Sequence, residues 1–517
     1  MPAVAPSPPL YAAPSGLIRR VAVIGGGISG LAAAHRLTEL SPQSHVTLFE
    51  AGERLGGALQ SVRRDGWLIE RSADMFITRE PEAVDLCRRI GLADELIGTN
   101  TQHRRSWVVR RGKLVPIPEG FTLMSPAKIW PILTTPLLSP LGKLRLAAEY
   151  LTPRRADTSD ESLESFVCRR FGREAFERLI QPLIGGIYTA DPAQLSMAAT
   201  LPQFVAMERK HGSLIRGMRA GVGSRESGVG SRELASGGRQ PAEDAASGAR
   251  YGLFVAPRLG MQQLVEAIAA KLPTGCVRLS CLVVRIEPHR VADGPRSPCW
   301  RVSLGGGGAE EFDDLILAAP GAASARLLAG VDDELSALIG RIPHAGCSIA
   351  VLGIRKEQAS HPLDGFGFVV PAIENRRIIA GSLASVKFAG RAPDGKVLLR
   401  VFVGGALQPE LGQLPEEEIR RLVLEELREL IGLSGEPEFF EVIRWQGMMP
   451  QYHVGHLDLV SQIEARSAAI PHFALAGNAY RGVGIPLCIR SGEAAAARIV
   501  TGSGVRGRES TDHRPTD

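Results

Sequence analysis

The feature that most constrains the fold is a glycine loop between a short apolar run and an alanine-rich stretch, RRVAVIGGGISGLAAAHRLTEL. The run from Val21 to Ile24 predicts a β-strand, and the alanine-rich stretch predicts a helix. The loop fits GxGxxG through Gly25, Gly27 and Gly30. In such a loop the first glycine permits a tight turn, the second lets backbone approach a pyrophosphate, and the third lets helix pack on strand. The helix start then offers unpaired N–H groups and a partial positive charge to phosphates.

An acidic residue at the end of the next predicted strand strengthens this interpretation. The stretch HVTLFE ends at Glu50, which Ala51 follows. A carboxylate there accepts hydrogen bonds from ribose hydroxyls and repels a 2′-phosphate. The βαβ unit therefore predicts an α/β, Rossmann-like domain that binds an adenine dinucleotide, with FAD and NAD both open at this point.

Two more glycine-rich segments need an explanation. RLGGALQS places Arg54 before Gly57 and Ala58, and GNAYRGVGIPLCIRSG precedes a second alanine-rich helix near the end of the chain. Turns stabilised by glycine are the plain interpretation of both. The alternative is that both lie against the same ligand as the first loop.

Composition limits the class of protein. A chain of 517 residues predicts two or three domains, and a net charge of +5 gives no argument for nucleic acid binding. No apolar run is long enough to predict a transmembrane helix. The seven cysteines are scattered without a CxxC pair, which indicates reduced thiols in a cytoplasmic protein and no metal site.

Three segments differ from the rest in composition. Residues 1–17, rich in Pro, Ala and Ser, predict a disordered tail rather than a signal peptide. Residues 219–250 repeat GVGSRE and predict a disordered insertion. Residues 116–155 are apolar, broken by proline and bounded by basic residues. This last segment fits either the wall of an apolar cavity or a surface that contacts a membrane.

The arrangement RLGG after the acidic strand resembles the RxGG motif of the amine-oxidase-like flavoproteins. Over roughly residues 20 to 500 the chain also resembles the oxygen-dependent protoporphyrinogen oxidase and coproporphyrinogen III oxidase family. The stretches that carry this resemblance are QPLIGGIYTADPAQLSM, FVAPRLGMQQL, PLDGFGFVVP, FAGRAPDGKVLLRVFVGG, QGMMPQYHVGHLDLV and GNAYRGVGIPLCIRSG.

The resemblance implies an α/β fold with a Rossmann-like, amine-oxidase-type FAD-binding domain, an α+β substrate-binding domain and a mostly helical domain. The implied division is a tail at 1–17, FAD-binding parts at 18–95, 251–320 and 446–502, a helical domain at 96–218, an insertion at 219–250, a substrate-binding domain at 321–445 and a tail at 503–517.

The implied cofactor is FAD, and its contacts carry over residue by residue. They are Gly25, Gly26, Gly27, Ile28, Ser29 and Gly30 at the phosphates; Glu50 and Ala51 at the ribose; Arg54, Gly57 and Ala58 along the pyrophosphate; Ser72, Ala73, Asp74 and Met75 in a flavin-contacting turn; Val283 at the adenine; and Asn478, Val483, Gly484 and Ile485 around the isoalloxazine. The turn departs from the family, which has more glycine and proline there.

The implied reaction is the six-electron oxidation of a porphyrinogen by an oxidoreductase acting on CH–CH groups, with dioxygen as acceptor and hydrogen peroxide as by-product. It needs no nucleophilic side chain and no metal, because the flavin carries the chemistry. An apolar slot would hold the macrocycle at Val369, Ser382 and Phe402, and Arg104 or Arg105 would meet a propionate. The same strand residues also fit an ordinary core, and the arginines fit a solvated basic turn.

Other functions stay open at this stage. An amine oxidase or carotenoid desaturase would share the fold, and a dinucleotide sensor would share the cofactor without catalysis. The sequence does not separate protoporphyrinogen IX from coproporphyrinogen III as substrate, and it does not give the oligomeric state. We expect a cytoplasmic protein, with peripheral contact at the inner face of the cell membrane and contact with the next enzyme of the haem pathway both open.

Overall fold

The structure is a computed structural model that describes residues 18–122, 124–126, 130–223, 253–289 and 299–502. The expected tails at 1–17 and 503–517 lie outside the described residues. So does the expected insertion from residue 224 onward. Its first residues belong to helix α10 (Leu214–Gly223), which continues past the expected boundary at 219.

A five-stranded parallel sheet begins with the predicted βαβ unit. Its order is β12-β2-β1-β16-β22, and β1 pairs with both β2 and β16 in parallel. The strands are β1 (Arg20–Ile24), β2 (His45–Phe49), β12 (Val277–Arg278), β16 (Asp314–Leu317) and β22 (Phe473–Leu475). Such sheets are covered on both faces, which explains the unbroken apolar runs in these strands.

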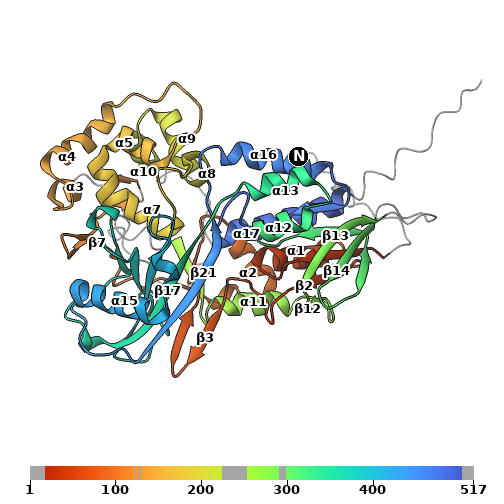
Figure 1. The fold of residues 1–517 in the computed structure, drawn as a ribbon. Helices are drawn as coiled ribbons and strands as arrows, with labels where there is room; N and C mark the ends of the chain where they lie inside the picture. Colours follow the sequence, from red (N-terminus) through yellow and green to blue (C-terminus); the bar gives the residue numbers. More distant parts are fainter. Residues whose placement is uncertain (1–17, 123, 127–129, 224–252, 290–298, 503–517) are drawn as a thin grey trace, which may run out of the picture.

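Helices cover both faces of this sheet (Figure 1). One face packs on α1 (Ile28–Leu40), α2 (Glu82–Ile90), α11 (Met261–Ala269) and α17 (Ile485–Gly502). The other face packs on α12 (Gly321–Leu328), α13 (Asp333–Gly340) and α16 (His456–Ala469). Helices α12 and α13 therefore pack with this first unit, although the sequence interpretation placed them in the substrate-binding domain.

The first and last helices of this unit meet at glycine. A Cβ on Gly492 of α17 would lie 2.0 Å from the carbonyl oxygen of Ser29 in α1. Only a residue without a side chain lets the two backbones approach this closely. The end of the chain is thereby held against its beginning.

A seven-stranded mixed sheet forms the second unit, in the order β21-β17-β20-β19-β18-β7-β8. The strands are β7 (Trp107–Arg110), β8 (Lys113–Pro116), β17 (His344–Arg355), β18 (Gly367–Val369), β19 (Ala380–Leu383), β20 (Lys396–Gly404) and β21 (Phe439–Pro450). Helix α15 (Glu416–Ile431) buries Leu427 and Val423 in the same cluster as the outer face of this sheet. Strands β7 and β8 come from a region that the sequence interpretation assigned to the helical domain.

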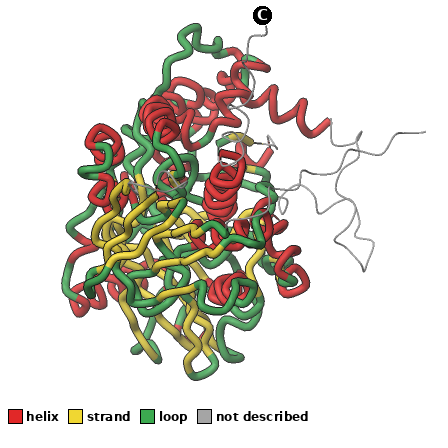
Figure 2. The backbone as a smooth tube through the Cα atoms, turned by 90° about the vertical axis from the view of Figure 1, so that its right-hand side faces the viewer, coloured by secondary structure: helices red, strands yellow, loops and turns green. Residues whose placement is uncertain are grey.

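A helical unit lies above the second sheet in Figure 1 and shares one apolar cluster. Its elements are α3 (Trp130–Thr134), α4 (Pro140–Ala147), η2 (Ala148–Leu151), α5 (Leu163–Phe171), α6 (Arg173–Ala175), η3 (Phe176–Ile180), α7 (Gln181–Tyr188), α8 (Met197–Thr200), α9 (Pro202–His211) and α10. A buried ion pair between Arg170 and Glu149 ties α5 to η2. Figure 2 shows most of the strands in the lower half of the molecule, with helices above them and on either side.

The remaining elements are short. They are β3 (Ser61–Arg64) with β4 (Trp67–Glu70); β5 (Phe76–Ile77), β11 (Phe254–Pro257) and β6 (Leu96–Gly98); β13 (Val283–His289), β14 (Cys299–Leu304) and β15 (Ala309–Phe312); β9 (Phe121–Thr122) with β10 (Ser125–Pro126); α14 (Ala384–Lys387); and the 3₁₀ turns η1 (Ala93–Glu95), η6 (Lys356–Gln358), η7 (Ala372–Glu374) and η8 (Leu411–Gln413). Within the described part of the chain, no helix has the length and apolarity needed to cross a bilayer.

The contact between α1 and α17 gives a stability prediction. Gly492→Ala should lower the free energy of unfolding by about 1–3 kcal/mol, because the added methyl group forces two backbones apart. Gly340→Ala is the control: it also lies in a helix, and a Cβ there would meet nothing within 4 Å. Thermal or urea unfolding of the two variants measures the difference, and equal stabilities would contradict the close contact.

Candidate active site

The glycine loop separates into turn-forming glycines and one that faces open space. Gly25 has φ +107°, and a Cβ on Gly30 would lie 1.9 Å from the Gly25 carbonyl oxygen. Gly27 caps α1, and a Cβ there would meet nothing within 4 Å. Glycine is therefore required at positions 25 and 30 by the turn and the packing, whereas Gly27 leaves room beside the N-terminus of the helix. This arrangement fits a pyrophosphate.

Glu50 is engaged by the backbone around it. One carboxylate oxygen accepts from the Gly26 N–H and the other from the Gly52 N–H, each at 2.7 Å. Each oxygen keeps a second lone pair for a ribose hydroxyl. The following chain, Ala51 included, runs beside the segment that leads into Val283, since the Cys281 N–H donates to the Glu50 carbonyl. The structure thus brings Glu50, Ala51 and Val283 to one end of the site.

Arg54 stabilises its own loop through hydrogen bonds. Its guanidinium donates to the carbonyls of Leu55, Leu59 and Gly57. The same loop reaches the first one, because the Gly56 N–H donates to the Gly26 carbonyl at 2.8 Å. Burial lowers the pKa of Arg54 below its ordinary value. Gly57 is exposed and lies beside Gly27, and Ala58 is half-buried.

Strand β21 joins the expected flavin turn to the C-terminal loop. The indole N–H of Trp445 donates to the Arg71 carbonyl at 2.6 Å, just before Ser72. Three residues further along, the Met448 carbonyl lies 3.4 Å from the side-chain nitrogen of Asn478. Successive strand residues advance by about 3.3 Å, so the two segments lie roughly 10 Å apart along the strand. Ala73 and Met75 belong to the same turn, and the hydroxyl of Ser72 is buried without a partner.

The C-terminal loop is held by one tyrosine. The hydroxyl of Tyr452 donates to the Asn478 carbonyl and accepts from the Gly482 N–H at 2.7 Å. Val483 and Gly484 follow, and a Cβ on Gly484 would come no closer than 3.8 Å to another atom. Ile485 is the first residue of α17. A second helix N-terminus and a second open glycine therefore face the site.

The candidate slot lies on the inner face of the second sheet. Val369, Ala380, Phe402 and Ile349 pair across four neighbouring strands and form one row. Ser382 pairs with Arg400 in the next row. The structure therefore brings together the three slot residues expected from the sequence.

The two candidate arginines separate. Arg105 forms a 2.6 Å ion pair with Asp364, and its side chain is 52% exposed. Arg104 instead buries its Nε atom without a partner. Of the two, Arg104 is the one that keeps a buried donor available to a carboxylate.

Sequence reasoning assigned no role to three further positions. Gly186 of α7 lies over the slot, because a Cβ there would contact Val369 at 3.5 Å. A glycine pair inside a helix costs stability, so the GG in QPLIGGIY was a readable signal. Lys387 and Arg400 are buried cations near the expected flavin turn, and only a three-dimensional structure reveals this proximity.

The described residues contain no group of three or more His, Cys, Asp or Glu side chains that could hold a metal ion. Cys347 lies on the inner face of the sheet, and burial raises the pKa of its thiol to about 11. The thiol is therefore protonated at neutral pH and a poor nucleophile.

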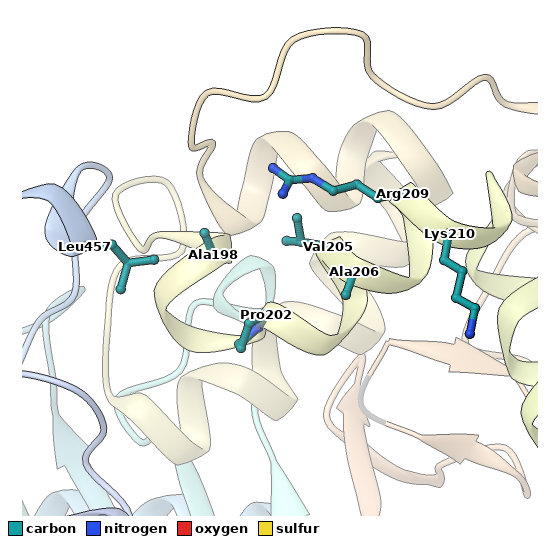
Figure 3. A pocket seen from close by; sticks show the side chains of 7 residues that line it. All are labelled: Ala198, Pro202, Val205, Ala206, Arg209, Lys210 and Leu457. Carbon is teal, nitrogen blue, oxygen red and sulfur yellow. The ribbon is translucent and has the colours of Figure 1, made fainter.

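A surface groove lies elsewhere. Figure 3 shows Pro202, Val205 and Ala206 of α9 lining it, with Leu457 of α16 beside them. None of the expected site residues contributes to this groove. It is therefore separate from the candidate active site.

The comparisons with known proteins agree with this geometry. The family model of flavin containing amine oxidoreductases matches residues 28–500. The chain belongs to this family. Its cofactor is FAD, and it is an oxidoreductase. The open glycines and two helix N-termini fit this cofactor.

Named relatives extend over nearly the whole chain. The coproporphyrinogen III oxidases of Bacillus subtilis and Staphylococcus aureus are 35% and 31% identical, over 93% and 94% of this chain and 98% and 99% of theirs. Protoporphyrinogen oxidase 2 of Arabidopsis thaliana is 28% identical over 93% of this chain and 94% of its own. A crystal structure of a candidate protoporphyrinogen oxidase from Exiguobacterium aligns with TM-score 0.79 and 30% identity, covering 93% of this chain and 99% of its own. The predicted fold class is confirmed.

The two open glycines predict a selective defect. Gly27→Val or Gly484→Val should lower FAD affinity at least tenfold while changing stability little, since a Cβ would meet no protein atom within 4 Å at Gly27 and only Pro486, at 3.8 Å, at Gly484. Flavin retention and the apoprotein melting temperature are the measurements. Gly482→Val is the contrasting variant: its φ is +131° and its Cβ would clash with Leu487, so folding itself should suffer. Full FAD binding in both open-glycine variants would contradict this placement of the cofactor.

Proposed function

We propose that the protein oxidises coproporphyrinogen III to coproporphyrin III with FAD and dioxygen, in haem biosynthesis. The identity of 31–35% with proteins named for this activity, along nearly the whole length of both chains, carries the proposal. The curated relatives named protoporphyrinogen oxidase are 27–28% identical, and the Exiguobacterium structure that carries this name is 30% identical. Solved amine oxidases at 16–17% identity support the fold alone.

When bound, FAD would supply two-electron redox chemistry with dioxygen as the final acceptor, so removal of six electrons would take three rounds and give three molecules of peroxide. The chain's own task is positioning. We assign the row Val369, Ala380 and Phe402 to an apolar wall of the macrocycle site, and Gly186 lets α7 pack closely on the Val369 end of this row. Arg104 is assigned to a propionate, since a buried carboxylate needs a cation.

We further assign the FAD contacts to the residues that the resemblance implied, from Gly25 through Ile485. The supporting observation is that their segments contact one another around the two helix N-termini. We also propose the division into an FAD-binding, a substrate-binding and a helical domain. Its boundaries are adjusted so that β7 and β8 count with the substrate sheet and α12 and α13 with the FAD-binding part.

Turnover of both porphyrinogens tests the function. The purified protein should bleach anaerobically with coproporphyrinogen III and recolour in air. Porphyrin fluorescence and peroxide should then rise in a ratio of one to three. Coproporphyrinogen III should give a kcat/KM at least tenfold above that for protoporphyrinogen IX, because a site that pairs the two additional propionates with polar or cationic groups would leave those groups unpaired against vinyl groups.

The opposite preference would assign protoporphyrinogen IX as the substrate and reject the finer proposal. A protein that retains FAD but oxidises neither porphyrinogen would reject the activity altogether.

We also propose that the helical unit contacts an anionic membrane surface, so that a cytoplasmic protein works at the inner face of the membrane. Six large apolar side chains between residues 130 and 151 are exposed: Trp130, Leu133, Leu141, Leu144, Tyr150 and Leu151. Clusters of this kind mark interaction sites, and tryptophan favours the membrane interface. Basic residues accompany them, since Arg216 stacks over Tyr150 and Arg154 is exposed.

Sedimentation with vesicles tests this contact. The double variant Leu141→Ser, Leu144→Ser should bind anionic phospholipid vesicles at least about tenfold more weakly than the unchanged protein, because insertion of two leucines is lost. The side chains are 78% and 68% exposed, so folding should not change. The control is Leu282→Ser. Leu282 is also exposed, but it lies just before β13 and outside the helical unit. Equal sedimentation of all three proteins would reject the proposed membrane contact. Binding to another protein but not to vesicles would instead assign this surface to a protein partner.

A further inference from the structure

Three buried charges meet behind the expected flavin turn. Asp74, in the turn, is 8% exposed, Lys387 at the end of α14 is 7% exposed, and Arg400 in β20 is 2% exposed. Lys387 Nζ lies 2.8 Å and Arg400 Nη1 3.2 Å from the same Asp74 carboxylate oxygen. Arg400 also donates through Nη2 to the carbonyl of Ser72. The turn is thus bound to the second sheet through one backbone and one side-chain acceptor.

The side chain of Asp74 points toward this sheet. The two cations outweigh the cost of burying the carboxylate and hold the pKa of Asp74 at about 2. It therefore stays ionised at any working pH. Lys387 and Arg400 account for the position of this carboxylate without any hydrogen bond that it would accept from a flavin.

The surrounding charges leave a positive excess. Glu70 and Arg391 are the other buried charges that interact with Asp74 or Arg400, one of each sign. Arg71, next to the turn, is paired with Glu441. Three buried cations therefore face two anions, which leaves about one net positive charge in a region of low dielectric. Burial makes the effect of such a charge larger than at the surface.

We propose that Asp74, Lys387 and Arg400 form a positioning cluster that fixes the flavin turn to the substrate-side sheet and favours reduced flavin through its net positive charge. This inference rests on the assignment of the 72–75 turn to the cofactor. Reduced flavin carries more negative charge than oxidised flavin, so a nearby cation raises the reduction potential. The unpartnered Nε of Arg400 and Oγ of Ser72 leave two more buried polar atoms at the junction.

Charge-removing and charge-conserving variants at one position separate electrostatics from structure. Lys387→Gln keeps a hydrogen-bond donor for Asp74 and removes the charge. It should shift the equilibrium between oxidised and reduced bound flavin about tenfold toward oxidised, or about 30 mV for a two-electron couple. Lys387→Arg should stay within about twofold of the unchanged protein. Dye-coupled anaerobic reduction of the FAD-loaded protein measures the potential.

The control is Lys396→Gln. Lys396 lies in the same strand β20 and pairs with Glu438, but both side chains are about 30% exposed. The reduction potential of FAD bound to the Lys396→Gln variant should not change, because solvent screens the lost charge. Should Lys387→Gln not fold, Arg400→Gln tests the same sign of shift.

An unchanged potential in a folded, FAD-loaded Lys387→Gln protein, or an equal shift in Lys396→Gln, would overturn the cluster's electrostatic role. A shift in reduction potential of equal size in Lys387→Arg would mean that Lys387 acts through packing rather than through its charge. These outcomes are separate from the proposed activity, since the unchanged protein would still bind FAD and turn over porphyrinogen.

Discussion

The approach of α17 to α1 at Gly492 is the contact on which the rest of the site depends. The backbone of Gly492, two turns into α17, lies against the Ser29 carbonyl in the first turn of α1. Both helices then direct their unpaired N–H groups toward the same region. Because the two helices come from opposite ends of the chain, the cofactor site can exist only once almost the whole protein has folded.

Local sequence was sufficient for the first part of the site. The strand, the glycine loop, the helix and Glu50 follow one another within a short stretch, and each residue type has a backbone reason to stand where it does. The structure gives some of these residues a bracing role as well. Glu50 accepts from Gly26 and Gly52, and Arg54 holds three carbonyls of its own loop. A sequence motif predicts the ligand contacts of such residues but not the hydrogen bonds that they form within the protein.

Sequence patterns predicted less well the features that depend on contacts between residues far apart in the chain. Strands β7 and β8 resemble many short apolar segments, and only the parallel pairing of β7 with β18 places them in the second sheet. Helices α12 and α13 follow directly after β16, and their apolar sides pack on the first unit rather than on the sheet that comes next. The cations Lys387 and Arg400 carry no local signal at all, because their meaning comes from Asp74, which lies more than 300 residues away.

The position of the substrate slot follows from how the chain joins its two large units. Strand β21 reaches Arg71 through Trp445 and Asn478 through Met448, so the sheet that carries the slot also spans both flavin-side segments. Arg400 adds a further tie from the neighbouring part of the same sheet to Ser72. A shift of the sheet would therefore move the slot floor and the flavin turn together. An enzyme that oxidises one macrocycle in three successive rounds benefits from this coupling, because a reacting carbon must meet the flavin at the same separation in each round. The residues that matter most for such a reaction are then those that hold two surfaces apart at a fixed distance, and they need not touch the substrate.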